Sequence, residues 1–204
     1  VDNDPNPSHE YEKPGRYLVT ATGGTTTGTG SNRYSFQTSL ERLVSWGELG
    51  WQSFQRLLRG VQGNPKIPQY LPSTVTDLSR MFEGADKFNQ PIGTWDTSNV
   101  INMSGMFREA EEFDQPIGSW DTSNVTDMSE MFRGGFSVDP KFNQPIGNWD
   151  TSSVTNMDFM FNRAESFNQD LTDWCVKNLD QGVVVTDLSI ASYDSISFDV
   201  STED

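Results

Sequence analysis

The chain has 204 residues, enough for one domain with a continuous core. It carries 29 Asp and Glu against 14 Lys and Arg, and the resulting charge of −15 argues against nucleic acid or an anionic membrane as partner. The acidity suits a secreted or surface-exposed protein and favours divalent cations, although solubility alone explains it equally well. The single cysteine, Cys175, excludes an internal disulfide, and no apolar run is long enough for a membrane helix.

The first 44 residues precede the clear repeats. Residues 1–13 are polar and acidic and contain proline, which is typical of a linker. Residues 17–22 and 33–38 have the β-branched and aromatic content of strands, and the Gly- and Thr-rich stretch 23–30 between them indicates a turn. We therefore expect an N-terminal β cap over residues 14–44 that covers the first repeat.

Residues 45–174 repeat with a period of about 25 residues. Four blocks share a Val-led apolar pattern that ends in Met-Phe: Val75–Phe82, Val100–Phe107, Val125–Phe132 and Val154–Phe161. Four more run from Phe to Trp: Phe88–Trp95, Phe113–Trp120, Phe142–Trp149 and Phe167–Trp174. The third unit carries an insertion at 134–141. Such a period indicates a stacked solenoid, because no single unit can bury its apolar face alone.

The local patterns predict one short helix and one short strand in each unit. Apolar residues at i, i+3, i+6 and i+7 of the first block match one face of a helix, and the Pro-led second block is typical of a brief strand. Met, Phe and Trp then stack in register as core. Residues 175–204 contain two strand-like segments, so we expect a C-terminal β cap. The predicted fold is an α/β, leucine-rich-repeat-like, right-handed solenoid with β caps at both ends, forming a single domain over residues 14–204.

The repeat unit Phe-Asn-Gln-Pro-Ile-Gly-x-Trp-Asp-Thr-Ser-x-Val-Thr-x-Met-x-x-Met-Phe resembles the BspA-like leucine-rich repeat family, and most closely its 25-residue branch of bacterial surface proteins. Residues 45–51, which contain Trp-Gly, resemble the lead-in that often precedes those arrays. The resemblance covers residues 44–174. It implies an extracellular or cell-surface module of a larger adhesin that works in cell attachment, without shared enzymatic activity. A chain that begins at Val1 without Met fits a module that has been processed or cut from a larger protein.

Two polar columns invite a ligand or a structural explanation. The first is a column of carboxylates that directly follow tryptophan: Asp96, Asp121 and Asp150. Carboxylates stacked so closely repel one another, so they either bind calcium or accept backbone hydrogen bonds in Asx turns. The second column follows phenylalanine: Asn89, Asp114, Asn143 and Asn168. We interpret it as an asparagine ladder that hydrogen-bonds successive coils.

Columns that vary between units are the candidates for recognition, because the fold does not dictate them. One precedes tryptophan and comprises Thr94, Ser119, Asn148 and Asp173. Two others lie in or after the Val-led block and contribute Arg80, Arg108 and Arg133, which could clamp a carboxylate such as a peptide C-terminus. Solvated arginines that balance nearby acids are the simpler alternative. Exposure of Trp46, Tyr70 or Phe136 would instead favour a carbohydrate ligand.

Enzyme classes find no support in the residue pattern. The sequence shows no Ser/His/Asp set, no Cys–His pair, no histidine cluster for zinc and no phosphate loop. We therefore expect a non-enzymatic module that binds a peptide or protein segment on a cell surface, with calcium as a predicted stabiliser. A carbohydrate-binding module and a passive spacer repeat remain as alternatives.

Overall fold

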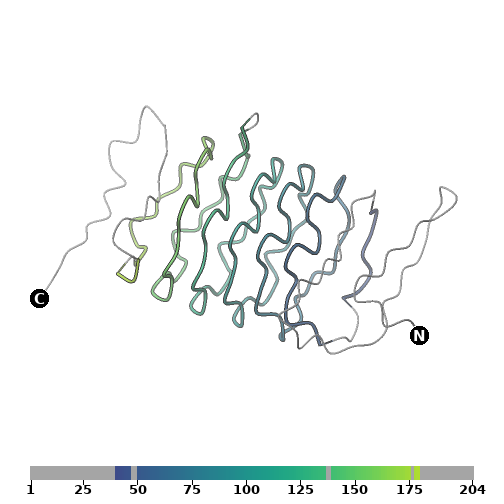
Figure 1. Ribbon diagram of the computed structural model, residues 1–204, viewed down its shortest axis with the longest axis horizontal. Coiled ribbons are helices and arrows are strands. Elements are labelled where there is room, and N and C mark those ends of the chain that lie inside the picture. Colours follow the sequence, from purple (N-terminus) through teal and green to yellow (C-terminus); the bar gives the residue numbers. More distant parts are fainter. Residues whose placement is uncertain (1–39, 47–49, 137–138, 176, 180–204) are drawn as a thin grey trace, which may run out of the picture.

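The chain winds through a row of coils that stack along one axis (Figure 1). The computed structural model describes residues 40–46, 50–136, 139–175 and 177–179. Parallel bridges connect equivalent residues of neighbouring coils in the order Ser53, Asp77, Asn102, Asp127 and Asn156. One sequence repeat is therefore one coil. Most of the predicted N-terminal cap (14–39), the linker (1–13) and the C-terminal cap from residue 180 onward lie outside the described residues.

The predicted α/β fold class is wrong. No described residue lies in an α-helix, and strand pairing within the described ranges is limited to isolated bridges. The Val-led blocks, predicted as helices, are runs of overlapping turns, and the Pro-led blocks form no strands. We call the side of the stack formed by these turn runs the turn wall; it comprises residues 54–61, 78–85, 103–110, 128–135 and 157–164.

Alternation of hydrogen-bond direction explains why the turn wall is neither helix nor sheet. The amide of Arg56 donates across to the carbonyl of Ser79 in the next coil, at 3.0 Å. The next amide, of Leu57, donates back to the carbonyl of Phe54 in its own coil, also at 3.0 Å. In a helix every amide would donate to a carbonyl of the same segment, and in a strand the ladder amides would donate to a neighbouring strand. In the turn wall the two kinds of hydrogen bond alternate along the chain.

Each turn run needs a residue with left-handed backbone. At the first such position φ lies between 55° and 60° in all five coils, at Arg56, Arg80, Gly105, Glu130 and Phe159. This is the third residue of a turn closed from residue i to i+3, where positive φ is characteristic of type II turns. Leu78, Met81 and Phe82 are fully buried in this run of turns, so the apolar spacing that suits one face of a helix occurs here without a helix.

Three aromatic columns run through the core, and they confirm the predicted stacking of phenylalanine and tryptophan in register. Successive Trp rings, from Trp95 to Trp174, stack with centroids 6.3–6.5 Å apart and planes within 5° of parallel. Two phenylalanine columns run beside them, with centroids 5.6–6.1 Å apart between coils. Each indole N–H of this column also donates to a carbonyl of the preceding coil, such as Trp120 Nε1 to Ile92 O at 3.1 Å. Each tryptophan of the column is therefore fixed both by burial of its ring and by the hydrogen bond of its indole N–H.

The asparagine ladder is confirmed, and it reaches one coil further back than predicted. The side-chain oxygen of Asn64 accepts the backbone N–H of Asn89 at 2.9 Å, and Asn89 accepts that of Asp114 at 3.1 Å. Asp114 and Asn143 continue the series into the later coils. These side chains supply acceptors where the coils have no β-ladder, so their role is structural.

Replacing Trp120 by Ala should lower the free energy of unfolding by about 3–5 kcal/mol, because it removes a 4% exposed ring with tryptophan neighbours on both sides. Urea titration followed by far-UV circular dichroism measures the change. Phe136→Ala is the control, because this ring is 86% exposed and its loss should alter stability by less than about 0.5 kcal/mol. Equal effects of the two substitutions would contradict the ladder as the source of stability.

Candidate ligand-binding surface

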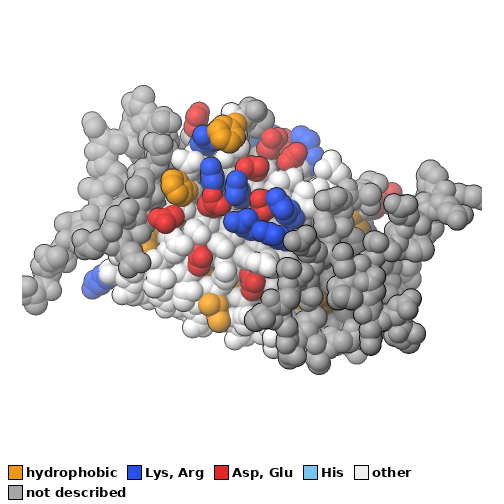
Figure 2. Space-filling model, viewed as in Figure 1, with side chains coloured by type: hydrophobic (Ala, Val, Ile, Leu, Met, Phe, Trp, Pro, Cys, Tyr) orange, Lys and Arg blue, Asp and Glu red, His pale blue; other side chains and the backbone are white. Residues whose placement is uncertain are grey.

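The turn wall presents two outward-facing columns of side chains. The first is the left-handed column, and the second lies three residues further along: Arg59, Glu83, Arg108, Arg133 and Asn162. Within the second column Glu83 and Asn162 are buried, whereas the three arginines are at least partly exposed. Figure 2 shows Lys and Arg side chains interspersed with Asp and Glu over the middle of one face. The backbone atoms of both columns take part in the hydrogen bonds of the coils, but their side chains differ from coil to coil.

Three predicted arginines converge on one glutamate in this wall. Arg108 Nη1 lies 3.0 Å and Arg80 Nη2 lies 3.9 Å from Glu130 Oε2, and Arg133 contacts the other carboxylate oxygen. We call these four residues the arginine cluster. The four side chains are 20–35% exposed, so solvent screens their charges less than it would on an open surface.

Gly105 allows the cluster to span three coils. It occupies the left-handed column between Arg80 and Glu130, with φ at 60°. A Cβ added to Gly105 would lie 3.1 Å from Arg80 Cγ and 3.9 Å from Arg108 Cβ. The arginine of one coil therefore crosses the space above this glycine to reach a carboxylate two coils away.

The cluster retains positive charge and unused hydrogen-bond donors. Among the described residues, only Glu130 and Glu109 form ion pairs with its three guanidinium groups, Glu109 by way of an oxygen 3.4 Å from Arg108 Nε. The geometry of that contact is too poor for a hydrogen bond, and the Nε atoms of Arg108 and Arg133 are buried without an acceptor. Since a guanidinium carries five donors, the cluster can accept a further anion at its exposed edges.

The predicted recognition column that precedes tryptophan forms hydrogen bonds between coils. The side chains of Thr94, Ser119 and Asn148 each donate to a carbonyl of the preceding coil, at 2.8, 3.0 and 2.8 Å. They are not joined to the arginine cluster by any hydrogen bond or ion pair within the described ranges. Asp173 is exposed, and Tyr70 is 50% exposed with its hydroxyl 3.3 Å from Ser45 Oγ. Thr94, Ser119 and Asn148 therefore differ in residue type but share one structural role, which is to hydrogen-bond the preceding coil.

The carboxylates predicted to bind calcium form Asx turns. Asp96 accepts the backbone N–H of Ser98 at 3.1 Å and its hydroxyl at 2.6 Å. Asp121 accepts both groups of Ser123 in the same manner, and Asp150 accepts the backbone N–H of Ser152 at 2.9 Å. Hydrogen bonds from these serines, the side-chain bond first, hold the pKa of Asp96 and of Asp150 below the ordinary value. Among the residues that the structure describes, no three His, Cys, Asp or Glu side chains group as metal ligands.

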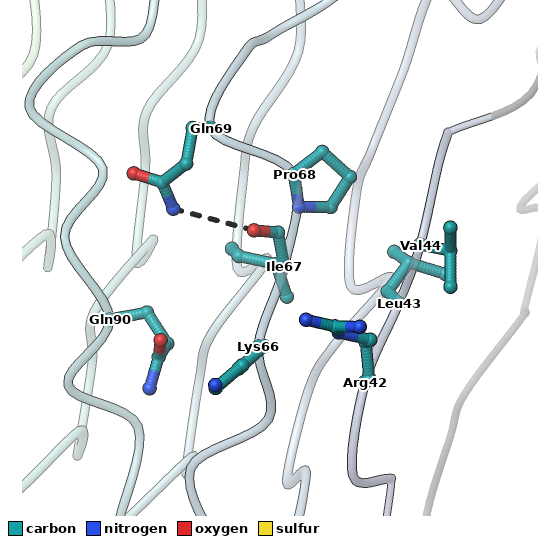
Figure 3. A pocket seen from close by; sticks show the side chains of 8 residues that line it. All are labelled: Arg42, Leu43, Val44, Lys66, Ile67, Pro68, Gln69 and Gln90. Carbon is teal, nitrogen blue, oxygen red and sulfur yellow. Dashed lines mark hydrogen bonds between the residues drawn. The ribbon is translucent and has the colours of Figure 1, made fainter.

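One cavity, of about 320 Å³, opens near the first described coils (Figure 3). Arg42 and Lys66 line it beside Ile67 and Pro68, and Gln69 donates to the Ile67 carbonyl at its edge. None of the predicted ligand-binding residues lines this cavity. It is therefore separate from the arginine cluster.

The sequence interpretation missed Arg163. This residue lies four positions after the first left-handed position of its coil and has φ at 60°. Gly60, Gly84 and Glu109 have left-handed backbone at the same position of their coils, and Gly134 stands there without it. Its guanidinium lies over the Phe136 ring, 3.7 Å from Arg163 Cζ to the centroid. The available signal was an arginine in a column where three of the other four coils carry glycine. Phe136 is exposed, as the carbohydrate alternative required, whereas Trp46 is 4% exposed and buried.

The fold and this surface define a repeat protein with a structural core and a variable charged wall. The chain belongs to the family described as Mycoplasma protein of unknown function, DUF285, which matches residues 52–139 and 133–185. No curated protein and no solved structure matches it. In the described ranges, no helix is long and apolar enough to cross a bilayer. The resemblance to BspA-like repeats stays a prediction.

Glu130→Gln should destabilise the protein by about 1 kcal/mol at low salt, because three partly buried guanidinium groups then lose their shared counter-charge. The loss should shrink in 1 M NaCl, where the Debye length falls to about 3 Å. Urea midpoints at both salt concentrations measure it. Glu112→Gln is the matched control, since Glu112 also contacts two cations, Lys87 and Lys141, but these are about 60% exposed. A larger effect at Glu112 would contradict the importance of the arginine cluster.

The double variant Asp96→Asn/Asp150→Asn should lose less stability in acid than the original protein. Because the folded-state pKa of each carboxyl lies below the unfolded value of 3.8, each stabilises the fold above that pH and ceases to do so as the pH falls through its folded-state pKa. Asn keeps an acceptor for the Asx turn but does not titrate. Urea midpoints between about pH 2 and 6 test this. Parallel pH profiles would show that these turns do not contribute to acid sensitivity.

Proposed function

We propose that this chain is a non-enzymatic binding module of a secreted or cell-surface adhesin, and that it binds a carboxylate-bearing peptide or protein segment through the arginine cluster. The observation that carries the proposal is the convergence of three arginines from three coils in a protein of net charge −15. A positive surface on an otherwise acidic molecule would direct an anionic segment to one place, because the remaining surface repels it.

The chemistry of the cluster favours carboxylates. A guanidinium presents a planar fork that fits a carboxylate with two parallel hydrogen bonds. Within the protein, Glu130 already pairs with single guanidinium nitrogens of Arg108 and Arg133, so the cluster accommodates a carboxylate. The turn wall also continues along the stack, so an extended segment lying along it would contact several coils at once. The affinity of such a segment would come from many modest contacts, each dependent on salt.

A carbohydrate ligand is the second candidate. The exposed ring of Phe136 and the half-exposed ring of Tyr70 favour it, because sugars stack on aromatic faces. Calcium also remains a proposal. In either case the ligand-binding assay should be run with calcium and with a chelator, and a difference between the two conditions would assign the metal a role.

The peptide proposal predicts that short acidic peptides with a free C-terminal carboxylate bind more tightly than the same peptides with a C-terminal amide. The double variant Arg108→Gln/Arg133→Gln should weaken binding by about tenfold or more, since hydrogen bonds to charged groups are worth about 1.5–3 kcal/mol. Fluorescence anisotropy of labelled peptides, with glycans on a parallel array, measures both effects.

Arg42→Gln is the matched control for this experiment, because it removes one positive charge at the separate cavity. Its binding should equal that of the unmodified protein at physiological salt. Equal binding by amidated peptides, or by the double variant, would contradict a carboxylate site at the cluster. Selective glycan binding would replace the peptide proposal by the carbohydrate one.

A further inference from the structure

The insertion of the third unit places an exposed aromatic ring against an arginine of the next coil. Phe136, at 86% exposure, lies under the guanidinium of Arg163, whose Cζ is 3.7 Å from the ring centroid. This is van der Waals contact, in the range where the positive guanidinium is attracted to the ring face. A large apolar side chain that is so exposed is not needed for the core.

Arg163 has no polar partner in the described ranges. No hydrogen bond or ion pair joins its guanidinium to a described residue, and its Nη1 is buried without an acceptor. The fold does not require arginine at this position either, because Gly60, Gly84 and Gly134 stand there in other coils. Its left-handed φ of 60° makes any side chain at this site unfavourable relative to glycine. Among the described residues, no ion pair with an acidic side chain therefore offsets the unfavourable backbone conformation of Arg163.

The ring and the arginine are held on a fixed support. Gly134 N–H donates to Asn162 O at 2.8 Å, and a Cβ on Gly134 would lie 2.1 Å from the carbonyl oxygen of Arg163. On the other side of the insertion, Asp139 accepts the backbone N–H of Ser166 at 3.2 Å. Contacts to the next coil therefore anchor the insertion on both sides of Phe136.

A second pair of the same kind adjoins the first. Arg133 Cζ lies 5.9 Å from the ring centroid of Phe159, which is 44% exposed. Arg133 also belongs to the arginine cluster, so the two pairs continue the positive surface into an aromatic one. Two cations and two exposed rings thus alternate over neighbouring coils. We call these four residues, Arg133, Phe136, Phe159 and Arg163, the mixed subsite.

From this arrangement we infer that the mixed subsite binds an acidic peptide segment in which a carboxylate lies next to an aromatic side chain. The donors of Arg163 other than the buried Nη1 pair with the carboxylate, and the exposed rings take the aromatic group by stacking. A purely acidic ligand would leave the rings exposed, and a purely apolar one would leave Arg163 without an acceptor. The inference rests on the proposed function, and it names the sequence character of the peptide.

The test uses the full chain and four related peptides, acetylated and amidated so that only one side-chain carboxylate is present: Gly-Ser-Glu-Trp-Ser-Gly, its Glu→Gln form, its Trp→Ala form and the form with both changes. Titration followed by ¹H–¹⁵N NMR, including the Arg Nε–H signals, gives each affinity. The Glu-Trp peptide should bind about tenfold more tightly than either single-change peptide. The Nε–H signal of Arg163 should shift on binding.

Arg163→Gly and Phe136→Ala should each reduce the affinity of the Glu-Trp peptide by about tenfold. Both variants should fold, because the first installs the glycine of other coils and the second alters an exposed ring. Arg56→Gly is the matched control: it removes an arginine with the same positive φ and without an ion pair in the described ranges, distant along the stack from Phe136. Its affinity should be unchanged.

The outcomes separate the two proposals. If Glu-Trp binding is lost in Arg163→Gly and retained in Arg56→Gly, the mixed subsite is established. If acidic peptides bind without preference for Trp, and only the Arg108→Gln/Arg133→Gln variant weakens them, the mixed subsite is refuted while the proposed function stands. If no carboxylate-bearing peptide binds, both are refuted.

Discussion

Hydrogen bonding between coils at every second residue of the turn wall is the constraint on which the remaining structure depends. It fixes the spacing of the coils, and it requires the intervening amides to find acceptors three residues back in their own coil. This pattern requires one residue with positive φ at the same position of every turn run. The columns of Phe, Met and Trp follow, because a strict coil-to-coil register places equal side chains above one another.

The sequence predicted the repeat, the register and the core, but not the local conformation. The recurrence of Trp95, Trp120 and Trp149 at the same place in each repeat was sufficient to infer stacking, since burial acts on the side-chain pattern regardless of backbone. The spacing of Leu78, Met81 and Phe82 was ambiguous, because it suits one face of a helix and also a chain of turns. The decisive signal would have been the left-handed residues, and only Gly105 marks that column by its residue type. Elsewhere Arg, Glu and Phe occupy it, which no propensity argument favours.

The candidate site was predicted in part for a similar reason. Columns that vary between repeats pointed to Arg80, Arg108 and Arg133, which do converge, but variation alone did not separate a binding position from a bridging one. Thr94 and its equivalents vary because several polar side chains can reach the same carbonyl. Arg163 could have been found by asking where a charged residue replaces glycine. The convergence on Glu130 depends on side-chain paths across coils, which a linear sequence does not display.

Coupling in a stacked solenoid normally runs only between adjacent units, so that such proteins fray from their ends. The empty position above Gly105 is an exception, because it lets Arg80 interact with Glu130 two coils away. Arg80 thereby links two coils that are not neighbours in the stack. A single residue without a side chain, Gly105, thus sets how far along the stack the charges of the arginine cluster extend.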